Sequence, residues 1–223
     1  MKLIVFDVDG TLVDSQGDIL AAMTRAFEGE GLTPPAREAV LSIVGLSLPQ
    51  AMARLAPQTD VVQQDRLTEG YKDAYVALRA ENGVAQSSPL YPGVRAMLDR
   101  LSEREDLLLG VATGKSRRGL DKLIAGHGLG GVFVTEQVAD FHPSKPHPAM
   151  LHSAMAEADV QARDTLMLGD TSFDMDMAHA AGCTGIGVSW GYHPVSALAR
   201  AAHIIDDIGA LDGIIRDIWG MSS

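Results

Sequence analysis

The chain has 223 residues, of which 46% are hydrophobic and 21% charged, and these proportions are ordinary for a globular protein. Its net charge of −11 argues against nucleic acid or an anionic membrane as the main partner. The single cysteine, Cys183, cannot form an internal disulfide, which favours a reducing compartment. Asp7 interrupts the first apolar run too early for a signal peptide, and no apolar run has the length of a membrane span. We therefore expect a cytoplasmic protein.

The chain begins with a short apolar run that ends in two acidic residues. Residues 3–6 are all apolar and predict a buried strand of a parallel sheet. Asp7 and Asp9 follow this strand directly, and Gly10 and Thr11 come next. Ligands of such sheets bind outside the carboxyl ends of the strands, and charges placed there need a partner or a cation. This strand end is therefore expected to carry chemistry.

The following block, residues 15–85, contains only helical patterns. The expected helices begin at Asp18, after Thr33-Pro34-Pro35, at Ser47 or Leu48, and at about Asp60. We find no strand-like alternation in this block. We interpret it as a helical insertion, residues 15–85, in an α/β core formed by residues 1–14 and 86–223.

The remainder of the chain alternates between strand and helix patterns. Apolar runs predict strands at 107–112, 132–134, 165–168, 185–188 and 203–205. Amphipathic patterns predict helices at 94–101, 116–125, 148–156, 173–180 and 194–201. This alternation is typical of a Rossmann-like parallel sheet that is covered on both faces by helices. The first strand must belong to the same sheet, because it is too short to stand alone.

The strand predicted at 107–112 leads into residues suited to binding phosphate. Thr113, Gly114 and Ser116 enter a predicted helix, and a hydroxyl with backbone N–H groups at such a position can bind an anion. A nucleotide-binding P-loop is excluded, because Leu109 stands where that motif needs glycine. The alternative is that Thr113 or Ser116 only caps the helix.

Lys145 lies in a segment rich in proline, His142 to Pro148. Prolines restrict the backbone, and a rigidly presented ammonium can neutralise a phosphoryl oxygen. The alternative is an ordinary solvated lysine in a loop. The neighbouring His142 and His147 do not form a recognisable set of metal ligands.

The strand predicted at 165–168 is followed by further acidic residues. Asp170 ends this strand, and Asp174 falls in the first turn of the next helix, where an acidic residue is also favoured by the helix dipole. Oxygen ligands from Asp7, Asp9 and Asp170 suit Mg²⁺. Without a cation these carboxylates would repel one another.

Four motifs in this order resemble those of the haloacid dehalogenase superfamily of phosphotransferases. They are DVDGT from Asp7, Thr113 in ATGK, Lys145 in SKPHP, and GDTSFD ending at Asp174. The resemblance implies that Asp7 is the nucleophile that becomes an aspartyl-phosphate. It implies that Asp9 is the general acid and base, with its backbone carbonyl in the metal site.

The same resemblance assigns the other site residues. Thr113, with Gly114 beside it, and Lys145 hold the phosphoryl group. Asp170 binds Mg²⁺ directly, and Asp174 supports it directly or through water. The helical insertion resembles the small cap domain of this superfamily.

Within the superfamily, Asp9 argues against dehalogenases and phosphonatases, which replace that acid. The stretch FDVDGTLVDS is most similar to phosphoglycolate phosphatase-like enzymes. The chain is therefore expected to be a Mg²⁺-dependent phosphomonoesterase acting on a small phosphorylated metabolite, with 2-phosphoglycolate as a candidate. A β-phosphoglucomutase-like mutase, a nucleotidase and a pyrophosphatase stay open, although Gly169 before Asp170 favours a hydrolase.

Two further hypotheses assign the chain to other classes of protein. A signalling receiver domain would need its phosphorylated aspartate on a middle strand and no helical insertion, so it does not fit. A catalytically silent binding protein on the same fold stays open, and so does the choice between monomer and dimer. In the cap, Gly45 and Ser47 are expected near the leaving group, because a tight glycine turn lets backbone approach a ligand.

Overall fold

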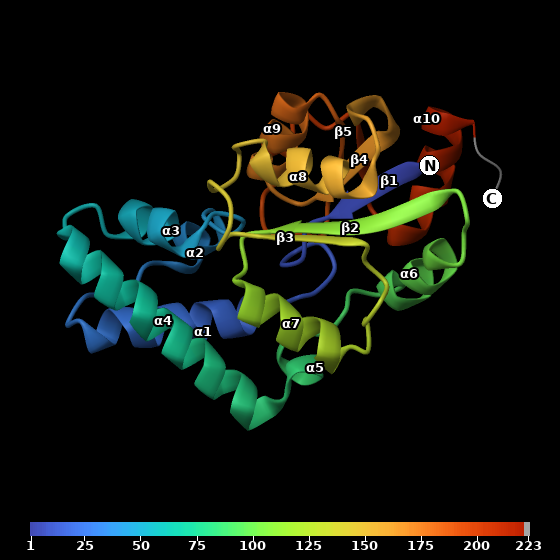
Figure 1. The fold of residues 1–223 in the computed structure, drawn as a ribbon. Coiled ribbons are helices and arrows are strands. Elements are labelled where there is room, and N and C mark those ends of the chain that lie inside the picture. Colours follow the sequence, from blue (N-terminus) through green and yellow to red (C-terminus); the bar gives the residue numbers. More distant parts are fainter. Residues whose placement is uncertain (221–223) are drawn as a thin grey trace.

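The computed structural model describes residues 1–220, apart from the side chain of Asn82. A six-stranded parallel sheet with the order β3-β2-β1-β4-β5-β6 forms the centre of the molecule (Figure 1). The strands are β1 (Lys2–Phe6), β2 (Leu107–Thr113), β3 (Thr135–Val138), β4 (Thr165–Gly169), β5 (Thr184–Val188) and β6 (His203–Ile205). The predicted α/β fold with a Rossmann-like parallel sheet is confirmed. The strand order reverses between β1 and β4, and ligands of such sheets bind at that point.

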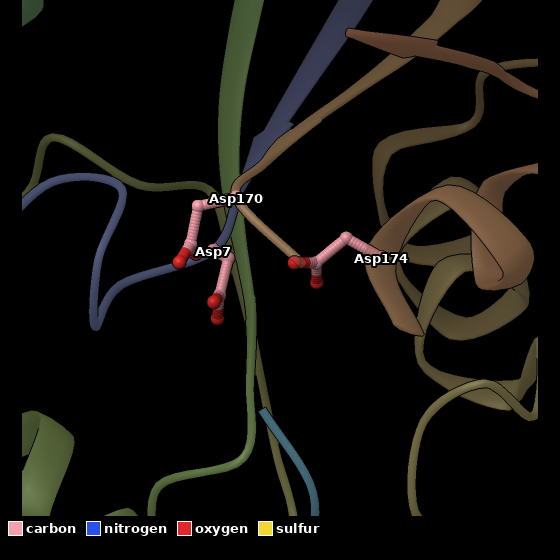
Figure 2. Close-up of side chains that lie close together, drawn as sticks. All are labelled: Asp7, Asp170 and Asp174. Atoms are coloured by element: carbon pink, nitrogen blue, oxygen red, sulfur yellow. The ribbon is translucent and has the colours of Figure 1, made fainter. Parts of the chain in front are cut away.

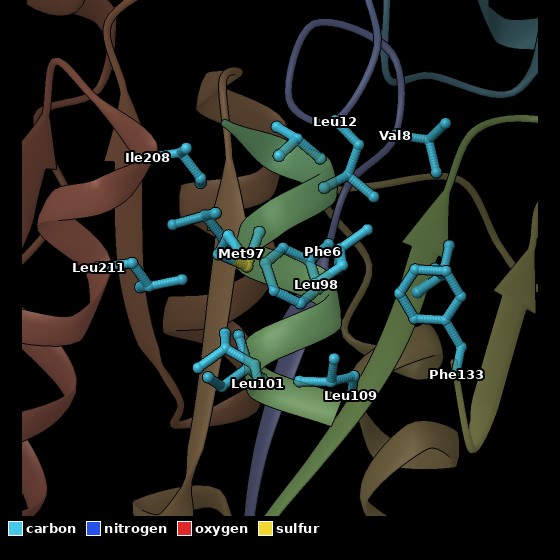
Figure 3. Close-up of a cluster of buried hydrophobic side chains, with 14 of the residues drawn as sticks. Phe6, Val8, Leu12, Met97, Leu98, Leu101, Leu109, Phe133, Ile208 and Leu211 are labelled. Atoms are coloured by element: carbon cyan, nitrogen blue, oxygen red, sulfur yellow. The ribbon is translucent and has the colours of Figure 1, made fainter. Parts of the chain in front are cut away.

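Strand β1 lies in the middle of the sheet and contributes to both of its faces. Ile4 and Phe6 pack on one face with residues of helices α6, α7 and α10, whereas Leu3 and Val5 pack on the other with residues of α8 and α9. All four side chains are fully buried, which explains the unbroken apolar run. Figure 3 shows the first of these clusters around Phe6.

The helices that cover the sheet follow its strands in the chain. Helices α8 and α9 cover one face, and α6, α7 and α10 cover the other (Figure 1). They are α6 (Val94–Ser102), α7 (Arg117–Gly126), α8 (Ala149–Ala158), α9 (Ser172–Ala181) and α10 (Leu211–Trp219). Single 3₁₀ turns, Ala162–Asp164, Val195–Ala197 and Ile208–Ala210, lie in the connections.

The segment between β1 and α6 is helical, as expected from its patterns. Its helices are α1 (Gln16–Gly29), α2 (Arg37–Leu41), α3 (Leu48–Leu55), α4 (Val61–Asn82) and α5 (Val84–Ser87). Helices α1 to α4 share an apolar cluster separate from the two clusters of the sheet, and Phe173 at the start of α9 belongs to it. Its two connections to the core run side by side, since the Asp14 N–H donates to the Pro89 carbonyl at 2.9 Å and Val13 bridges Leu90.

Two elements of the sheet layer were predicted wrongly. The strand expected at 132–134 forms instead at Thr135–Val138, and Val134 is 54% exposed. The true strand is an edge strand with polar residues, so its sequence lacks the apolar run that marks a buried strand.

The helix expected at 194–201 is only a 3₁₀ turn, because Leu198 is the one fully buried side chain of that stretch and no apolar stripe exists. Helix α10 was not predicted. Across residues 1–220, every helix is too short or too polar to cross a bilayer.

Candidate active site

Three buried carboxylates converge where β1 and β4 end. Asp7 follows β1, Asp170 follows β4, and Asp174 lies in the first turn of α9. One oxygen from each lies within 4.8 Å of the others (Figure 2). The pairing of β1 with β4 brings the first two together, since the Asp7 N–H donates to the Leu168 carbonyl at 2.8 Å. This is the reversal point of the strand order, where a ligand site is expected.

Close backbone packing and hydrogen bonds hold Asp170 in place. Its two oxygens accept hydrogen bonds from the Tyr192 N–H at 2.8 Å and from the Thr11 hydroxyl at 3.0 Å. A Cβ on Gly10 would lie 2.2 Å from Asp170 Oδ2, and Gly10 has a φ of +84°. Only glycine fits at this turn, which explains the Asp-Gly step after β1.

Lys145 supplies a positive charge to this cluster. Its Nζ donates to Asp174 Oδ1 at 2.6 Å and forms an ion pair with Asp7 Oδ1 at 2.8 Å. The side chain is fully buried, so the interpretation as a solvated loop lysine was wrong. Asp174 Oδ2 accepts hydrogen bonds from the Thr171 hydroxyl at 2.7 Å and the Thr171 N–H at 3.0 Å, so this carboxylate also caps α9.

The charges of the cluster do not balance. Burial raises the pKa of Asp7 to about 7, against the lowering effect of Lys145, and Asp174 raises it further. Burial also raises the pKa of Asp170, with Asp7 and Asp174 acting in the same direction. One buried ammonium therefore faces three buried carboxylates.

The residues present fit a hard divalent cation. Within the described part of the chain, neither oxygen of Asp7 accepts a hydrogen bond of good geometry. Lys145 pairs with Asp7 Oδ1, but one ammonium leaves three buried carboxylates with excess negative charge, and a cation removes that cost. A donor set made only of carboxylate oxygens suits Mg²⁺ or Ca²⁺.

Asp9 has different partners from this cluster. Its two oxygens each lie 2.7 Å from Lys115 Nζ, and the Ser15 hydroxyl donates to one of them. Asp9 is not among the three converging carboxylates, so any part it has in a metal site falls to its backbone carbonyl. The side chain is only 8% exposed, at the boundary between the core and α1.

Lys115 is a site residue that the sequence analysis missed. It follows Thr113 and Gly114 directly in the chain. Its Nζ donates to the Tyr75 hydroxyl at 3.2 Å and lies 5.1 Å from the centre of the Tyr75 ring. Burial lowers the pKa of Lys115, but the charge of Asp9, the nearby Tyr75 and the hydrogen bond to Asp9 together raise the pKa above its ordinary value, so the ammonium form is retained. Lys115 thus connects the core to α4.

Thr113 and Gly114, two of the residues predicted to bind phosphate, lie where β2 ends. Thr113 is buried, and its hydroxyl accepts a hydrogen bond from the Lys115 N–H at 3.2 Å. A Cβ on Gly114 would lie 2.8 Å from the carbonyl oxygens of Gly45 and Leu46. Glycine at this position therefore allows the backbones of the core and the insertion to touch.

The loop 43–47, which we call the cap loop, rests on the core. Gly45 has a φ of +98°, and a Cβ there would lie 3.3 Å from the Thr171 hydroxyl. The Ser47 N–H donates to the Ser144 hydroxyl at 2.8 Å, next to Lys145. Further along, His193 Nδ1 accepts a hydrogen bond from the Ser172 N–H at 3.2 Å, and His193 Nε2 donates to the Ser42 carbonyl at 3.1 Å.

A cavity of about 180 Å³ lies between the core and helices α1, α3 and α4. Of the predicted site residues, its lining includes Asp7, Asp9, Gly45, Thr113 and Gly114. The lining also includes Tyr75, Arg79 and Lys115, which were not predicted. The cavity is closed by the cap loop on one side and opens onto one edge of the carboxylate cluster at Asp7.

The chain is similar in sequence to known proteins. Residues 4–188 match the model of the haloacid dehalogenase-like hydrolases. The chain belongs to this family. A protein named probable phosphatase IndB from Dickeya dadantii is 33% identical to it, over 99% of this chain and 96% of that protein. A phosphoglycolate phosphatase of Haemophilus influenzae is 32% identical, over 86% of this chain and 87% of its own length.

Solved structures show the same fold at lower sequence identity. The chain is similar to a predicted phosphoglycolate phosphatase from Haemophilus somnus, with a TM-score of 0.84, 24% identity, and coverage of 96% of this chain and 97% of that one. It is also similar to a β-phosphoglucomutase from Clostridium difficile, with a TM-score of 0.83, 18% identity, and coverage of 99% and 97%. The family and the phosphatase relatives confirm the prediction of a hydrolase acting on phosphoric monoesters.

Proposed function

We propose that this protein is a Mg²⁺-dependent phosphatase that hydrolyses a small phosphorylated metabolite through an aspartyl-phosphate on Asp7. The buried cluster of Asp7, Asp170, Asp174 and Lys145, which meets a small cavity at Asp7, is the observation that carries this proposal. The relatives named phosphoglycolate phosphatase support 2-phosphoglycolate as the first substrate to test. The buried single cysteine is consistent with a cytoplasmic location.

In the first step, an oxygen of Asp7 attacks the phosphorus atom, and the bond from phosphorus to the leaving oxygen breaks. Asp9 donates a proton to that leaving oxygen. Asp7 Oδ2 supports the role of nucleophile, because it accepts no hydrogen bond among the described residues, whereas Oδ1 is paired with Lys145. Lys145 and Thr113 hold the phosphoryl oxygens, with Lys145 opposing their negative charge.

In the second step, a water molecule attacks the phosphorus of the aspartyl-phosphate while Asp9 accepts its proton. The bond from phosphorus to Asp7 breaks, and inorganic phosphate leaves. Asp9 thus begins the cycle with the proton that it donates in the first step and ends it with the proton taken from water.

Asp7, Asp170, Asp174 and the backbone carbonyl of Asp9 are the groups that would hold Mg²⁺. When bound, Mg²⁺ neutralises the carboxylates and the phosphoryl oxygens and orients them toward each other. Residues 15–85 act as a cap, with the cap loop against Gly114, Thr171 and Ser144. A closed cap excludes bulk water and large substrates.

A phosphate-release assay on the purified protein tests this function. With Mg²⁺, we expect turnover of para-nitrophenyl phosphate and faster turnover of 2-phosphoglycolate. Both activities should vanish in chelator and return with Mg²⁺, and Ca²⁺ should inhibit because its longer bonds misplace the reacting groups. Calorimetric titration with Mg²⁺ should show binding to the wild type and weakened binding to Asp170→Asn. Full activity in chelator would refute the proposal.

A further inference from the structure

One cation in the cavity has donors that no described group of the protein accepts in a hydrogen bond. Arg79 lies on α4, lines the cavity and is only 5% exposed. Its Nη2 donates to the Ser88 hydroxyl at 2.8 Å. Among the described residues, its Nε and Nη1 have no hydrogen-bond acceptor, and Asp18 Oδ2 lies 3.9 Å from Nε. That separation is too long for a hydrogen bond.

The hydrogen bonding of Arg79 differs from that of an arginine with a structural role. Arg117 shows the contrast, because its guanidinium donates to both Asp121 and Glu136 at the surface. Leaving charged donors without acceptors inside a protein costs free energy. The open donors of Arg79 therefore indicate that an acceptor arrives with the substrate.

The position of Arg79 relates it to the leaving group. Its guanidinium lies 4.7 Å from the centre of the Tyr75 ring, and Lys115 Nζ lies 5.1 Å from the same centre. Lys115 in turn contacts Asp9, the proposed acid for the leaving oxygen. Arg79 is thus connected to Asp9 through Tyr75 and Lys115, and Asp170 and Asp174 do not line the cavity that Arg79 lines.

We propose that Arg79 binds a carboxylate on the leaving group, so that the preferred substrate is a short phosphorylated acid. The inference rests on the proposed phosphatase function and adds to it the residue that selects the substrate. A guanidinium presents N–H donors in a geometry that matches a carboxylate. The volume of about 180 Å³ admits only a leaving group of a few heavy atoms, since ligand cavities are usually larger.

The test compares 2-phosphoglycolate with its carboxamide analogue, which has the same shape but no negative charge on the leaving group. We expect the wild type to prefer the acid by about 100-fold in kcat/KM, the loss that follows when a buried charged donor loses its ionic acceptor. In Arg79→Met, kcat/KM for the acid should fall by about 100-fold while the value for the amide changes little. Arg79→Lys should restore part of the preference. Arg66→Met, on the exposed face of α4, is the matched control and should leave both values unchanged.

The outcomes separate this inference from the function on which it rests. A merely structural Arg79 would lower turnover of acid and amide equally, and that result would overturn the assignment. If Arg79→Met does not fold, the wild-type ratio decides, because equal turnover of acid and amide also overturns it. Turnover of para-nitrophenyl phosphate in that case leaves the phosphatase function standing. Failure to hydrolyse any of these phosphates would refute the function itself.

Discussion

The proposed phosphoryl end and leaving-group end of the site are built from different parts of the chain and in different ways. At the phosphoryl end, Asp7, Asp170 and Asp174 follow core strands or begin a core helix, and Lys145 is fully buried against them. At the leaving-group end, Tyr75 and Arg79 come from the cap helix α4. The first group is held by hydrogen bonds and close backbone packing, whereas Arg79 keeps open donors.

This difference places the residues proposed to react and the residues proposed to select the substrate on different parts of the chain. The groups proposed to react sit on rigid strand ends, where small displacements would be costly to catalysis. The groups proposed to choose the substrate lie on α4, outside the sheet, so they can change without disturbing it. Substitutions at the phosphoryl end should therefore affect every substrate, and those at the other end should affect substrates unequally.

The largest effect is expected at Asp7. Asp7→Asn removes the attacking oxygen and should lower kcat by at least about 10⁴-fold for aryl and alkyl phosphates alike. Steady-state phosphate release measures this loss, with circular dichroism to check the fold. Asp73→Asn, on the exposed face of α4, is the control and should retain activity. Residual turnover within tenfold of wild type would rule out a nucleophilic Asp7.

Asp9 should give a smaller effect that depends on the leaving group. Asp9→Asn removes the proton donor and should slow turnover of an alkyl phosphate by about 10³-fold. Formation of the phosphoenzyme from para-nitrophenyl phosphate should slow by only about tenfold, because that leaving group needs little protonation. Rapid-quench measurement of nitrophenol release separates the two steps. Equal and small losses on both substrates would contradict an acid–base role.

A change in the cap loop should alter selectivity. Gly45→Arg places a side chain against Thr171 and lifts the loop from the core, so kcat/KM for 2-phosphoglycolate should fall roughly 10- to 100-fold. The value for para-nitrophenyl phosphate should change much less. Gly31→Arg is the matched control, because Gly31 also has a positive φ but open space around its Cβ position. Unchanged selectivity in Gly45→Arg would mean that the cap loop does not choose substrates.

The smallest effect concerns the contact of His193 with the cap. Burial lowers the pKa of His193, despite the opposing effects of Asp174 and the Ser42 carbonyl. On acidification below about pH 6.5 the unfolded imidazole takes up a proton before the folded one, so the free energy of unfolding should fall by about 1 kcal/mol toward pH 5. Urea unfolding should show a shallower decline in His193→Gln, whereas the exposed control His152→Gln should follow the wild type. Equal slopes in all three proteins would contradict the assignment.

The positions of Asp7 and Asp170 could be predicted from the sequence because each directly follows a strand. An apolar run followed by an acid predicts both the buried strand and the position of Asp7 or Asp170. The leaving-group end could not be predicted, because helical periodicity gives the buried face of α4 but not the partners of Arg79. Lys115 was missed for a related reason, since its contacts with Asp9 and Tyr75 exist only after the cap packs on the core. The polar edge strand β3 likewise lacks the apolar run that predicts the inner strands.

Detection of a phosphoryl group on Asp7 tests the central claim most directly. The Asp9→Asn variant should form the phosphoenzyme from para-nitrophenyl phosphate and hydrolyse it slowly, so the intermediate accumulates. After acid quench and digestion, mass spectrometry should find one phosphoryl group on the peptide that contains Asp7. The double variant Asp7→Asn, Asp9→Asn should carry none. A phosphoryl group on another residue, or an unmodified Asp7 while nitrophenol is released in a burst, would contradict the account.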